Sequence, residues 1–419
     1  MNSERRYREA YVWIWLPGQT EPVVAGKLEA DRGLVHFNYG RSYLDRADDP
    51  VSAIPIYLPE LPLKAGRISL QDDLREPGCI RDAAPDAWGQ RVILNKLMGA
   101  RGAGADTAEL GLLAYLLESG SDRIGALDFQ ASPSEYLPRT ADGAPLEELM
   151  ESAHKVEQGI PLSSPLDQAL FHGSSIGGAR PKVLIQDESG KYIAKFSSTS
   201  DLYNVIKAEY IAMRLAALAG ITTAKVKLVK AVNREVLLVE RFDREKTPAG
   251  WTRKIMISAL TLLGLDAMRA RYASYADLAE IVRHRFDNPK ETLRELYRRL
   301  CFNILCGNTD DHARNHAAFW DGKSLQLTPA YDICPQSRTG QEASQAMEIS
   351  GGNRMSCRSA CVEAAAHFQL EPAAAAAVFN DMVGVIEGAW KAVCDEAELG
   401  EVDRKLLWGR QFLNPFAFG

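Results

Sequence analysis

The sequence changes its hydrophobic pattern near residue 255, and this change limits the possible folds more than any other feature. Before it, short apolar runs such as Val183–Asp187 and Lys191–Phe196 are separated by turn residues, which predicts β-strands joined in hairpins. Beyond it, apolar side chains recur every three or four residues, most clearly in Glu291–Leu305, which predicts helices. We therefore expect an α+β chain in which a strand-rich part precedes an almost entirely helical part.

The N-terminal part reads as a small β-rich domain of its own. Its expected strands cover residues 11–16, 23–28, 33–39 and 122–129. Helices are expected up to residue 97, over 109–117 and, in the next domain, over 203–218. Residues 131–165 are rich in Pro, Ser and Gly, which predicts a linker. The expected domains are an N-terminal accessory domain over 1–150, a strand-rich lobe over 165–245 and a helical lobe over 246–419.

Composition limits the class of protein. With 419 residues, of which 46% are apolar and 25% charged, the chain has the balance of a globular protein of more than one domain. Its net charge is −6 and it has no long basic run, which argues against a protein that binds nucleic acid mainly by itself. The seven cysteines form no Cys-x-x-Cys pair, so neither a disulfide framework nor a zinc site is expected. Without an apolar leader or a run of 18 apolar residues, we expect a cytoplasmic protein and no membrane partner.

The densest polar cluster, Gly307–His316, lies between the apolar helix 291–305 and the apolar run Ala317–Trp320. A second acid, Asp332, lies between apolar neighbours, where an isolated carboxylate is costly unless it is paired or binds a cation. Phosphoryl transfer from ATP requires a carboxylate for the proton of the attacking hydroxyl, and an Asn and an Asp for magnesium. Asp310, Asn315 and Asp332 occur in this order and at this spacing, so they are the expected catalytic base and metal ligands.

Three upstream segments fit the same chemistry. The small residues of 174–182 would let backbone N–H groups approach phosphates, with Lys182 adding charge. Lys195 ends an apolar strand and needs an anionic partner, for which Glu209 on the next helix is the candidate. The string Glu240–Arg244 falls at the junction of the two lobes, where kinases hold adenine with backbone groups and an apolar wall. Each segment read alone is also compatible with an ordinary turn or a surface lysine.

Taken together, these strings resemble the HipA family over nearly the whole chain. They are Gly177–Lys182, Lys195-Phe196, Arg241-Phe242-Asp243, Gly307–Asn315 and Tyr331-Asp332, in the family's order. Pro85–Gly89 and Asp122–Leu127 resemble its accessory domain, and the chain from Ser350 onward resembles its helical C-terminal bundle. The resemblance implies a protein-kinase-like two-lobed fold with a β-rich ATP lobe and an all-helical C-terminal lobe.

The resemblance also implies a role for individual residues, with ATP and Mg²⁺ as cofactors. Asp310 would be the catalytic proton acceptor, with Asn315 and Asp332 as metal ligands and Glu209 in a structural ion pair. The implied ATP-binding residues are Gly177, Gly178, Ala179, Arg180, Pro181, Lys182, Lys195, Glu240, Arg241, Phe242, His312, Ala313, Arg314, Asn315, Tyr331 and Asp332. Ser175 would be the site of inhibitory autophosphorylation, with Ser174 beside it as the other candidate.

Family members are serine/threonine-protein kinase toxins of toxin–antitoxin pairs, which implies a set of partners. The implied substrate is a translation component, an aminoacyl-tRNA synthetase such as the glutamyl enzyme, whose phosphorylation arrests growth and produces persistence. The implied antitoxin is a HipB-like helix-turn-helix protein, through which the chain would reach operator DNA. The acidic charge balance agrees with indirect DNA contact.

Two other functions remain open at this point. The first is a metal-dependent phosphoesterase built on Asp310, Asp311, His312, His316 and Asp332, since Asp/His clusters also bind pairs of metals. It leaves Lys195 and the order of the lobes unexplained. The second is a nucleotide-binding co-repressor without transferase activity, against which the intact Asp310, Asn315 and Asp332 argue.

Overall fold

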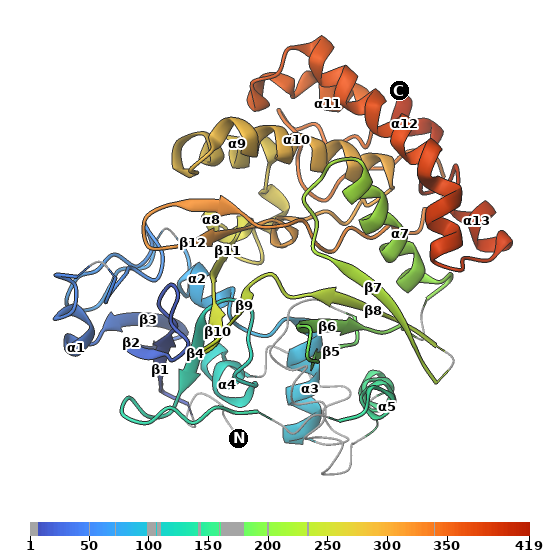
Figure 1. The fold of residues 1–419 in the computed structure, drawn as a ribbon. Coiled ribbons are helices and arrows are strands. Elements are labelled where there is room, and N and C mark those ends of the chain that lie inside the picture. Colours follow the sequence, from blue (N-terminus) through green and yellow to red (C-terminus); the bar gives the residue numbers. More distant parts are fainter. Residues whose placement is uncertain are drawn as a thin grey trace. The chain divides into compact units, whose positions relative to one another are not determined.

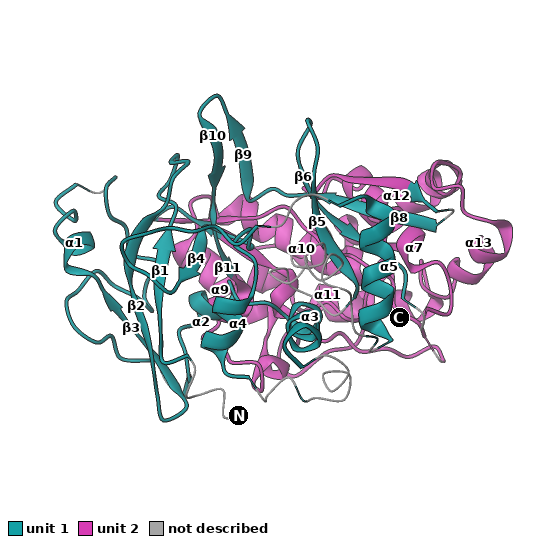
Figure 2. Ribbon diagram, turned by 90° about the horizontal axis from the view of Figure 1, so that it is seen from below, with its two compact units in different colours: residues 1–199, 230–257, 319–323 teal, residues 200–229, 258–318, 324–419 magenta. Residues whose placement is uncertain are grey.

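A computed structural model gives the structure of the chain and describes residues 7–49, 51–71, 73–98, 106, 110–140, 144–158, 160, 180–198, 201–232, 234–338 and 340–419. The chain forms two compact units, coloured separately in Figure 2. Unit 1 comprises residues 1–199, 230–257 and 319–323, and unit 2 comprises 200–229, 258–318 and 324–419. Most of the expected domains 1–150 and 165–245 therefore fall in unit 1, and most of 246–419 falls in unit 2.

The first sheet of unit 1 is antiparallel, with strand order β3-β2-β1-β4 (Figure 1). Its strands are β1 (Glu9–Ile14), β2 (Val23–Asp31), β3 (Leu34–Tyr39) and β4 (Leu127–Gln130). Buried side chains alternate with half-buried ones along β3, so one face of this strand packs against the core. At Gly26 on β2 a Cβ atom would lie 2.2 Å from the backbone oxygen of Asn38 on β3. The close approach of the two paired strands at this point therefore requires glycine.

The described part of unit 1 also contains helices. They are α1 (Arg41–Leu44), α2 (Gly78–Arg81), α3 (Ala87–Met98), α4 (Leu112–Glu118) and α5 (Leu146–Glu157). Helix α5 lies within the segment expected to be a linker, so that part of the prediction is wrong. The Pro, Ser and Gly residues flank a stretch with acids in its first turn and Leu149, Ala153 and Val156 on one buried face, which is enough for an amphipathic helix.

A second sheet of unit 1 contains β5 (Lys182–Gln186), β6 (Lys191–Lys195) and β8 (Arg234–Glu240), antiparallel and side by side. Asp187 stabilises the turn between β5 and β6, because its Oδ1 accepts from the backbone N–H groups of Ser189 (2.8 Å) and Gly190 (2.9 Å). Strands β9 (Arg244–Thr247) and β10 (Gly250–Arg253) then form a hairpin directly after β8. The segment 182–196 therefore folds as the sequence predicts.

Unit 2 is mainly helical. Its helices are α7 (Val205–Leu218), α8 (Ala259–Leu262), α9 (Tyr275–Arg285), α10 (Pro289–Leu305), α11 (Arg358–Glu363), α12 (Pro372–Glu396) and α13 (Glu401–Leu407). Helix α10 is central, since it packs against α9, α11 and α12. In the part of the chain that the structure describes, no helix is both long enough and apolar enough to cross a membrane.

Four short strands lie at or near the points where the chain passes between the units. They are β7 (Val226–Ala231), β11 (Ile255–Ser258), β12 (Ala317–Trp320) and β13 (Leu325–Leu327). Strands β11 to β13 were not expected beyond residue 255, because three or four residues are too few to establish a period. The segment from Ser350 is also not helical at its start. Gly351 (φ 57°) and Gly352 (φ 83°) make a tight turn there, and helix begins only at Arg358.

Candidate active site

The polar segment 307–316 of unit 2, called here the 307–316 loop, begins where α10 ends. Gly307 has φ 71°, and a Cβ atom at this position would lie 2.7 Å from the backbone oxygen of Gln411, so only glycine fits. Asn308 is buried and donates from Nδ2 to Asn303 Oδ1 at 3.0 Å. These contacts fix the direction in which the loop leaves the helix core.

Asp310 and Asn315 lie in one turn of this loop, as the sequence predicts. The Asp310 side chain is exposed, whereas Asn315 is 8% exposed and ends a single 3₁₀ turn over Ala313–Asn315. Asn315 Nδ2 lies 3.5 Å from the backbone oxygen of Asp310, to which it donates. With the amide nitrogen turned to the loop's own backbone, the amide oxygen is the atom that a magnesium ion would take.

Asp332 belongs to the same group of residues. Tyr331, immediately before it, donates its hydroxyl hydrogen to the backbone oxygen of Arg314 at 2.7 Å, which ties this segment to the loop. Asp332 itself has φ 59°, a left-handed conformation that costs a non-glycine residue about 1–3 kcal/mol and is held in place by the surrounding structure.

Electrostatics link the acids of this group. Partial burial raises the pKa of Asp310 above its ordinary value of 3.8. The neighbouring His312 opposes this shift, while the charges of Asp332 and Asp311 add to it. The smaller part of the shift that comes from Asp332 and Asp311 is repulsion between carboxylates, which a divalent cation would relieve. One Asp, one Asn and phosphate oxygens form a donor set that suits magnesium.

The residues required by a two-metal phosphoesterase are arranged differently. Asp311 and His316 are 2% exposed and bind each other and Tyr275, with Asp311 Oδ1 3.0 Å from His316 Nε2. Among the described residues, no group of three or more His, Cys, Asp or Glu side chains could hold a metal ion. Asp311 and His316 are therefore part of the core of unit 2, and the phosphoesterase reading loses two of its five ligands.

In unit 1, Lys182 and Lys195 are direct cross-strand partners on β5 and β6. They are 5% and 8% exposed, so two buried ammonium groups project from the same face of one strand pair, and they are called here the lysine pair. Side by side on one face, the two ammonium groups concentrate positive charge there. A polyphosphate is a ligand that this arrangement suits. Trp88 on α3 positions β5 by donating from Nε1 to the backbone oxygen of Lys182 at 2.9 Å.

The expected adenine segment, Glu240 to Phe242, ends β8 in unit 1. Glu240 and Phe242 are half-buried, and the Phe242 ring meets Phe319 edge-on at 6.0 Å between centroids. The Arg241 side chain is 4% exposed and turns into the protein, so any contribution of this residue to adenine binding would come from its backbone.

Arg241 belongs to a group of charged residues in unit 1 called here the Asp122 cluster. Its members are the buried Arg241, Asp243 and Arg244 and the half-buried Asp122 and Lys191. Asp122 accepts from Lys191 Nζ (2.9 Å), Arg241 Nη1 (3.0 Å) and Arg244 Nη2 (3.0 Å). Asp243 accepts from Arg241 Nη2 (2.8 Å) and Arg244 Nη1 (2.7 Å). The same Nη atoms of the two arginines also donate to the carbonyl oxygens of Arg123 and Gly125. The loop after α4 therefore holds Arg241 and Asp243, the residues on either side of Phe242, in place.

The cluster perturbs the acidity of its members. Burial by itself would raise the pKa of Asp122, but Arg241, Arg244, Lys191 and Arg253 together hold it well below 3.8. Burial lowers the pKa of Arg244 to about 9, and repulsion from Arg241 contributes. Sequence reasoning connected Asp122 with an accessory-domain motif but not with the adenine segment, because 119 residues separate Asp122 from Arg241.

The other predicted site residues are distributed as follows. Gly177, Gly178, Ala179, Ser174 and Ser175 lie outside the described residues. Pro181 is buried and Arg180 half-buried just before β5, and Ala313 is buried between the half-buried His312 and Arg314. Glu209 is 2% exposed on α7 in unit 2. Its pairing with Lys195 of unit 1 remains a prediction.

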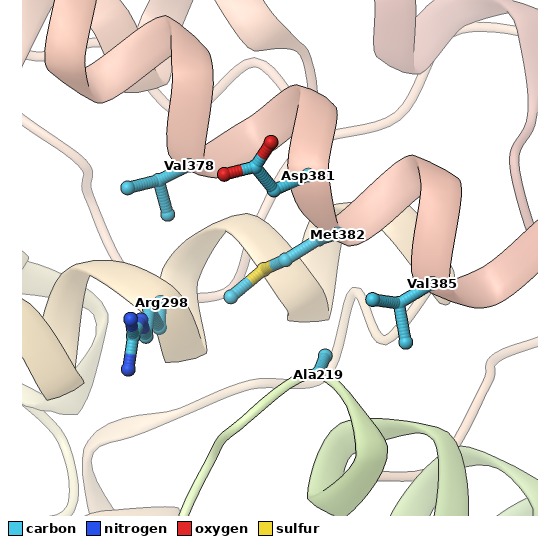
Figure 3. A pocket seen from close by; sticks show the side chains of 6 residues that line it. All are labelled: Ala219, Arg298, Val378, Asp381, Met382 and Val385. Carbon is cyan, nitrogen blue, oxygen red and sulfur yellow. The ribbon is translucent and has the colours of Figure 1, made fainter.

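A pocket of about 70 Å³ lies in unit 2, away from these residues (Figure 3). Met382 and the valines of α12 face Ala219 at the end of α7, with Arg298 of α10 on another side. Ligand sites for drug-sized molecules occupy about 300–1,000 Å³, so this pocket is too small for a nucleotide. It shares no lining residue with the predicted site.

Comparison with known proteins shows which family the chain resembles. The family model of the HipA-like C-terminal domain matches residues 174–390. The candidate kinase Y4mE of Sinorhizobium fredii is 27% identical over 354 residues, which is 76% of each chain. The serine/threonine-protein kinase toxin HipA of Shewanella oneidensis is 26% identical over 184 residues, 38% of this chain and 42% of that protein.

A solved structure extends the likeness to the whole fold. A chain of the Shewanella oneidensis complex of HipA, HipB and operator DNA superposes with a TM-score of 0.69 at 19% identity, covering 97% of this chain and 99% of that chain. This match confirms the predicted α+β, kinase-like fold. Since the family model covers more than half of its residues, the chain belongs to the HipA family of kinases.

Proposed function

We propose that the chain is an ATP- and magnesium-dependent protein serine/threonine kinase. The observation that carries this proposal is the group formed by Asp310, Asn315 and Asp332, in which the Asn315 amide bonds the Asp310 backbone and the charge of Asp332 acts on the Asp310 carboxylate, whose pKa is raised. A proton acceptor works best when its pKa is closer to the operating pH, so the shift suits Asp310 for its role. A protein kinase needs these three groups in one place.

Each residue of the site has a role in the proposed reaction. Bound ATP and magnesium supply the phosphoryl group and most of the charge neutralisation. Asp310 orients the hydroxyl of a protein serine or threonine and accepts its proton as the new P–O bond forms. The bond from the γ-phosphorus to the β–γ bridging oxygen breaks, and ADP leaves. Asn315 and Asp332 hold the metal through amide and carboxylate oxygens. The lysine pair binds phosphate oxygens, and the Glu240–Phe242 segment binds adenine.

The test is transfer of labelled γ-phosphate to protein in the presence of magnesium. Asp310→Asn should abolish transfer while leaving nucleotide binding within about twofold, because the lysine pair and the adenine segment are unchanged. Asp381→Asn, the same change at an exposed acid of α12 in the same unit, is the matched control and should keep full activity. Transfer that persists in Asp310→Asn would remove this residue from its role. ATP binding without transfer in the unmodified chain would favour the co-repressor function.

We further propose that the kinase is the toxin of a toxin–antitoxin pair and binds a HipB-like helix-turn-helix antitoxin. Its support is the likeness to a toxin named HipA and to a chain of a HipA, HipB and operator DNA complex. A net charge of −6 suits a chain that reaches DNA through such a partner. Gel-shift measurements on operator DNA should detect the complex with the antitoxin and not the kinase alone. A shift by the kinase alone at the same concentration would contradict this indirect contact.

The proposed substrate is an aminoacyl-tRNA synthetase, of which the glutamyl enzyme is the first to test. The proposed autophosphorylation site is Ser175, with Ser174 as the alternative. Incubation with labelled ATP, alone and with purified synthetases, followed by peptide mass spectrometry, identifies both. Ser175→Ala and Ser174→Ala, tested separately, should differ, with only one of them losing the self-label. Equal self-labelling in both variants would place the modification elsewhere.

A further inference from the structure

Three polar side chains form a buried triangle beneath the 307–316 loop of unit 2. Asp311 Oδ1 lies 3.0 Å from His316 Nε2, the Tyr275 hydroxyl lies 3.2 Å from the same nitrogen, and Tyr275 donates a short hydrogen bond to Asp311 Oδ2. Tyr275 is 0% exposed and the other two are 2% exposed. We call these residues the Tyr275 triangle.

Two residues of the triangle are chain neighbours of the two proposed functional residues of the loop. Asp311 follows Asp310 and His316 follows Asn315, so these two triangle residues are each one Cα–Cα step of 3.8 Å from a proposed functional residue. Asp311 points into the protein while Asp310 is exposed, so the two neighbours leave the backbone in different directions. Fixing Asp311 and His316 therefore fixes the two ends of the turn.

Tyr275, the third residue of the triangle, connects the loop to helix α9. Tyr275 is the first residue of α9, a helix of 11 residues whose N-cap Ser274 accepts from the N–H groups of Ala276 and Asp277. The His316 backbone oxygen also accepts from Ala259 N at 2.8 Å, at the start of α8. The loop is thus held by directed bonds to α8 and α9 in addition to its own turn.

Stability alone does not account for this arrangement. Burying a carboxylate, an imidazole and a phenol has a large desolvation cost, and apolar side chains of similar volume fill such a site more cheaply. His316 Nδ1 even lacks a partner among the described residues, so the triangle is not fully satisfied. Hydrogen bonds add direction, which apolar packing does not supply, and direction matters where reacting groups must be held within about 0.5 Å.

We propose that Tyr275, Asp311 and His316 are positioning residues that hold Asp310 and Asn315 in the geometry needed for phosphoryl transfer. This inference rests on the proposed kinase function. The triangle touches neither nucleotide nor substrate and acts by holding the backbone of the loop. Loss of one corner should therefore lower kcat and leave the KM for ATP nearly unchanged, since the lysine pair of unit 1 is untouched.

The experiment compares Tyr275→Phe with Tyr297→Phe. Both remove one hydroxyl from a fully buried tyrosine of unit 2, but Tyr297 bonds the carbonyl oxygen of Ala375, outside the loop. A misplacement of about 1 Å costs about 100-fold in rate, so Tyr275→Phe should lower kcat 10- to 100-fold with the KM for ATP changed less than twofold. Tyr297→Phe should keep kcat within twofold. Equal losses of kcat in the two variants would overturn the proposal.

A second pair of variants separates positioning from folding. His316→Leu removes the donor to Asp311, whereas His316→Gln returns an N–H near the position of Nε2. The Gln variant should recover at least ten-fold of the kcat lost in the Leu variant. No recovery, with both variants equally stable in thermal unfolding, would show that the bond to Asp311 does not matter for the reaction.

Hydrogen exchange tests the positioning claim independently of catalysis. In Tyr275→Phe, amides of residues 308–316 should exchange at least ten-fold faster than in the unmodified chain, with α12 unchanged. If the unmodified chain transfers no phosphate, the kinase proposal fails, but faster exchange confined to the loop would still support the triangle as its anchor. Unchanged exchange in the loop would refute the triangle even if the chain is an active kinase.

Discussion

Removing the charge of Asp122 tests how unit 1 holds its adenine segment. The Asp122 carboxylate faces Lys191, Arg241 and Arg244 at 2.9–3.0 Å, and its side chain is only 18% exposed. Asp122→Asn keeps the shape and one acceptor oxygen but leaves these cations without their shared anion. The variant therefore isolates the charge from the packing.

The expected magnitude follows from the three contacts. A hydrogen bond to a charged group contributes about 1.5–3 kcal/mol and a neutral one about 0.5–1.5 kcal/mol, so each contact weakens by about 1 kcal/mol. Removing one partner of a buried ion pair costs about 3–5 kcal/mol, and the remaining amide oxygen places Asp122→Asn at the lower end. We expect unit 1 to lose about 3 kcal/mol of its free energy of unfolding.

Tryptophan fluorescence during urea unfolding measures this loss, because five of the seven tryptophans (Trp13, Trp15, Trp88, Trp251 and Trp320) belong to unit 1. The matched control is Asp31→Asn. Asp31 pairs with Arg67 at 3.3 Å, but both side chains are about half exposed, so this change should cost less than about 1 kcal/mol. Equal losses in the two variants would refute the argument that burial makes the Asp122 contacts strong.

The pH dependence of this difference has a defined sign. The folded-state pKa of Asp122 lies well below its ordinary value, so its contribution to stability is present above the unfolded pKa of about 3.9 and is lost as the pH falls below it. The difference in stability between the unmodified chain and Asp122→Asn should be largest above about pH 5 and shrink toward pH 3. A difference that grows on acidification would contradict this assignment.

Three further changes have defined outcomes. Gly307→Ala should lower the stability of unit 2 by about 2 kcal/mol in thermal unfolding, because φ is 71° and the new methyl group would meet Gln411. Lys195→Met should raise the KM for ATP at least ten-fold in a kinase assay, while Lys246→Met, at an exposed position of β9, should leave it unchanged. Arg299→Met removes a fully buried guanidinium that bonds a glutamate and a carbonyl oxygen, and should cost unit 2 about 3 kcal/mol in urea unfolding.

Elements that depend on local pattern could be predicted from the sequence. Helix α10 has a long apolar face and ends at a glycine, and the hairpin β5–β6 has a turn whose Asp187 caps two N–H groups. Helix α5 and the short strands β11 to β13 were missed. Flanking Pro, Ser and Gly hid the apolar face of α5, and strands of three or four residues are defined by their neighbours rather than by their own sequence.

Some residues of the candidate site could likewise be predicted from the sequence, and others could not. Asp310 and Asn315 could be assigned because they lie five residues apart in one loop, and Asp332 because the order of residues is that of a kinase. The residues that hold the site in place could not be predicted from the sequence. Tyr275 is 36 residues from Asp311, and nothing in its own segment, which reads as an ordinary helix start, marks a polar contact. Such contacts depend on which elements pack together, and one sequence does not contain that information in readable form.

The contacts around Asp122 make the N-terminal domain part of the kinase fold. The HipA-like family model begins at residue 174, yet Arg241 and Asp243 within it bond to Asp122, Arg123 and Gly125 outside it. A chain of residues 174–419 would keep the Arg241–Asp243 pair but lose its bonds to Asp122, Arg123 and Gly125, and each buried donor or acceptor left unsatisfied costs about 1–3 kcal/mol. We expect it to aggregate when expressed alone and to fold when residues 1–160 are co-expressed. Residues 1–160 carrying Asp122→Asn should rescue it less well, measured as soluble yield and recovered ATP binding. A stable, ATP-binding 174–419 chain would show that the adenine segment needs no support from the loop after α4.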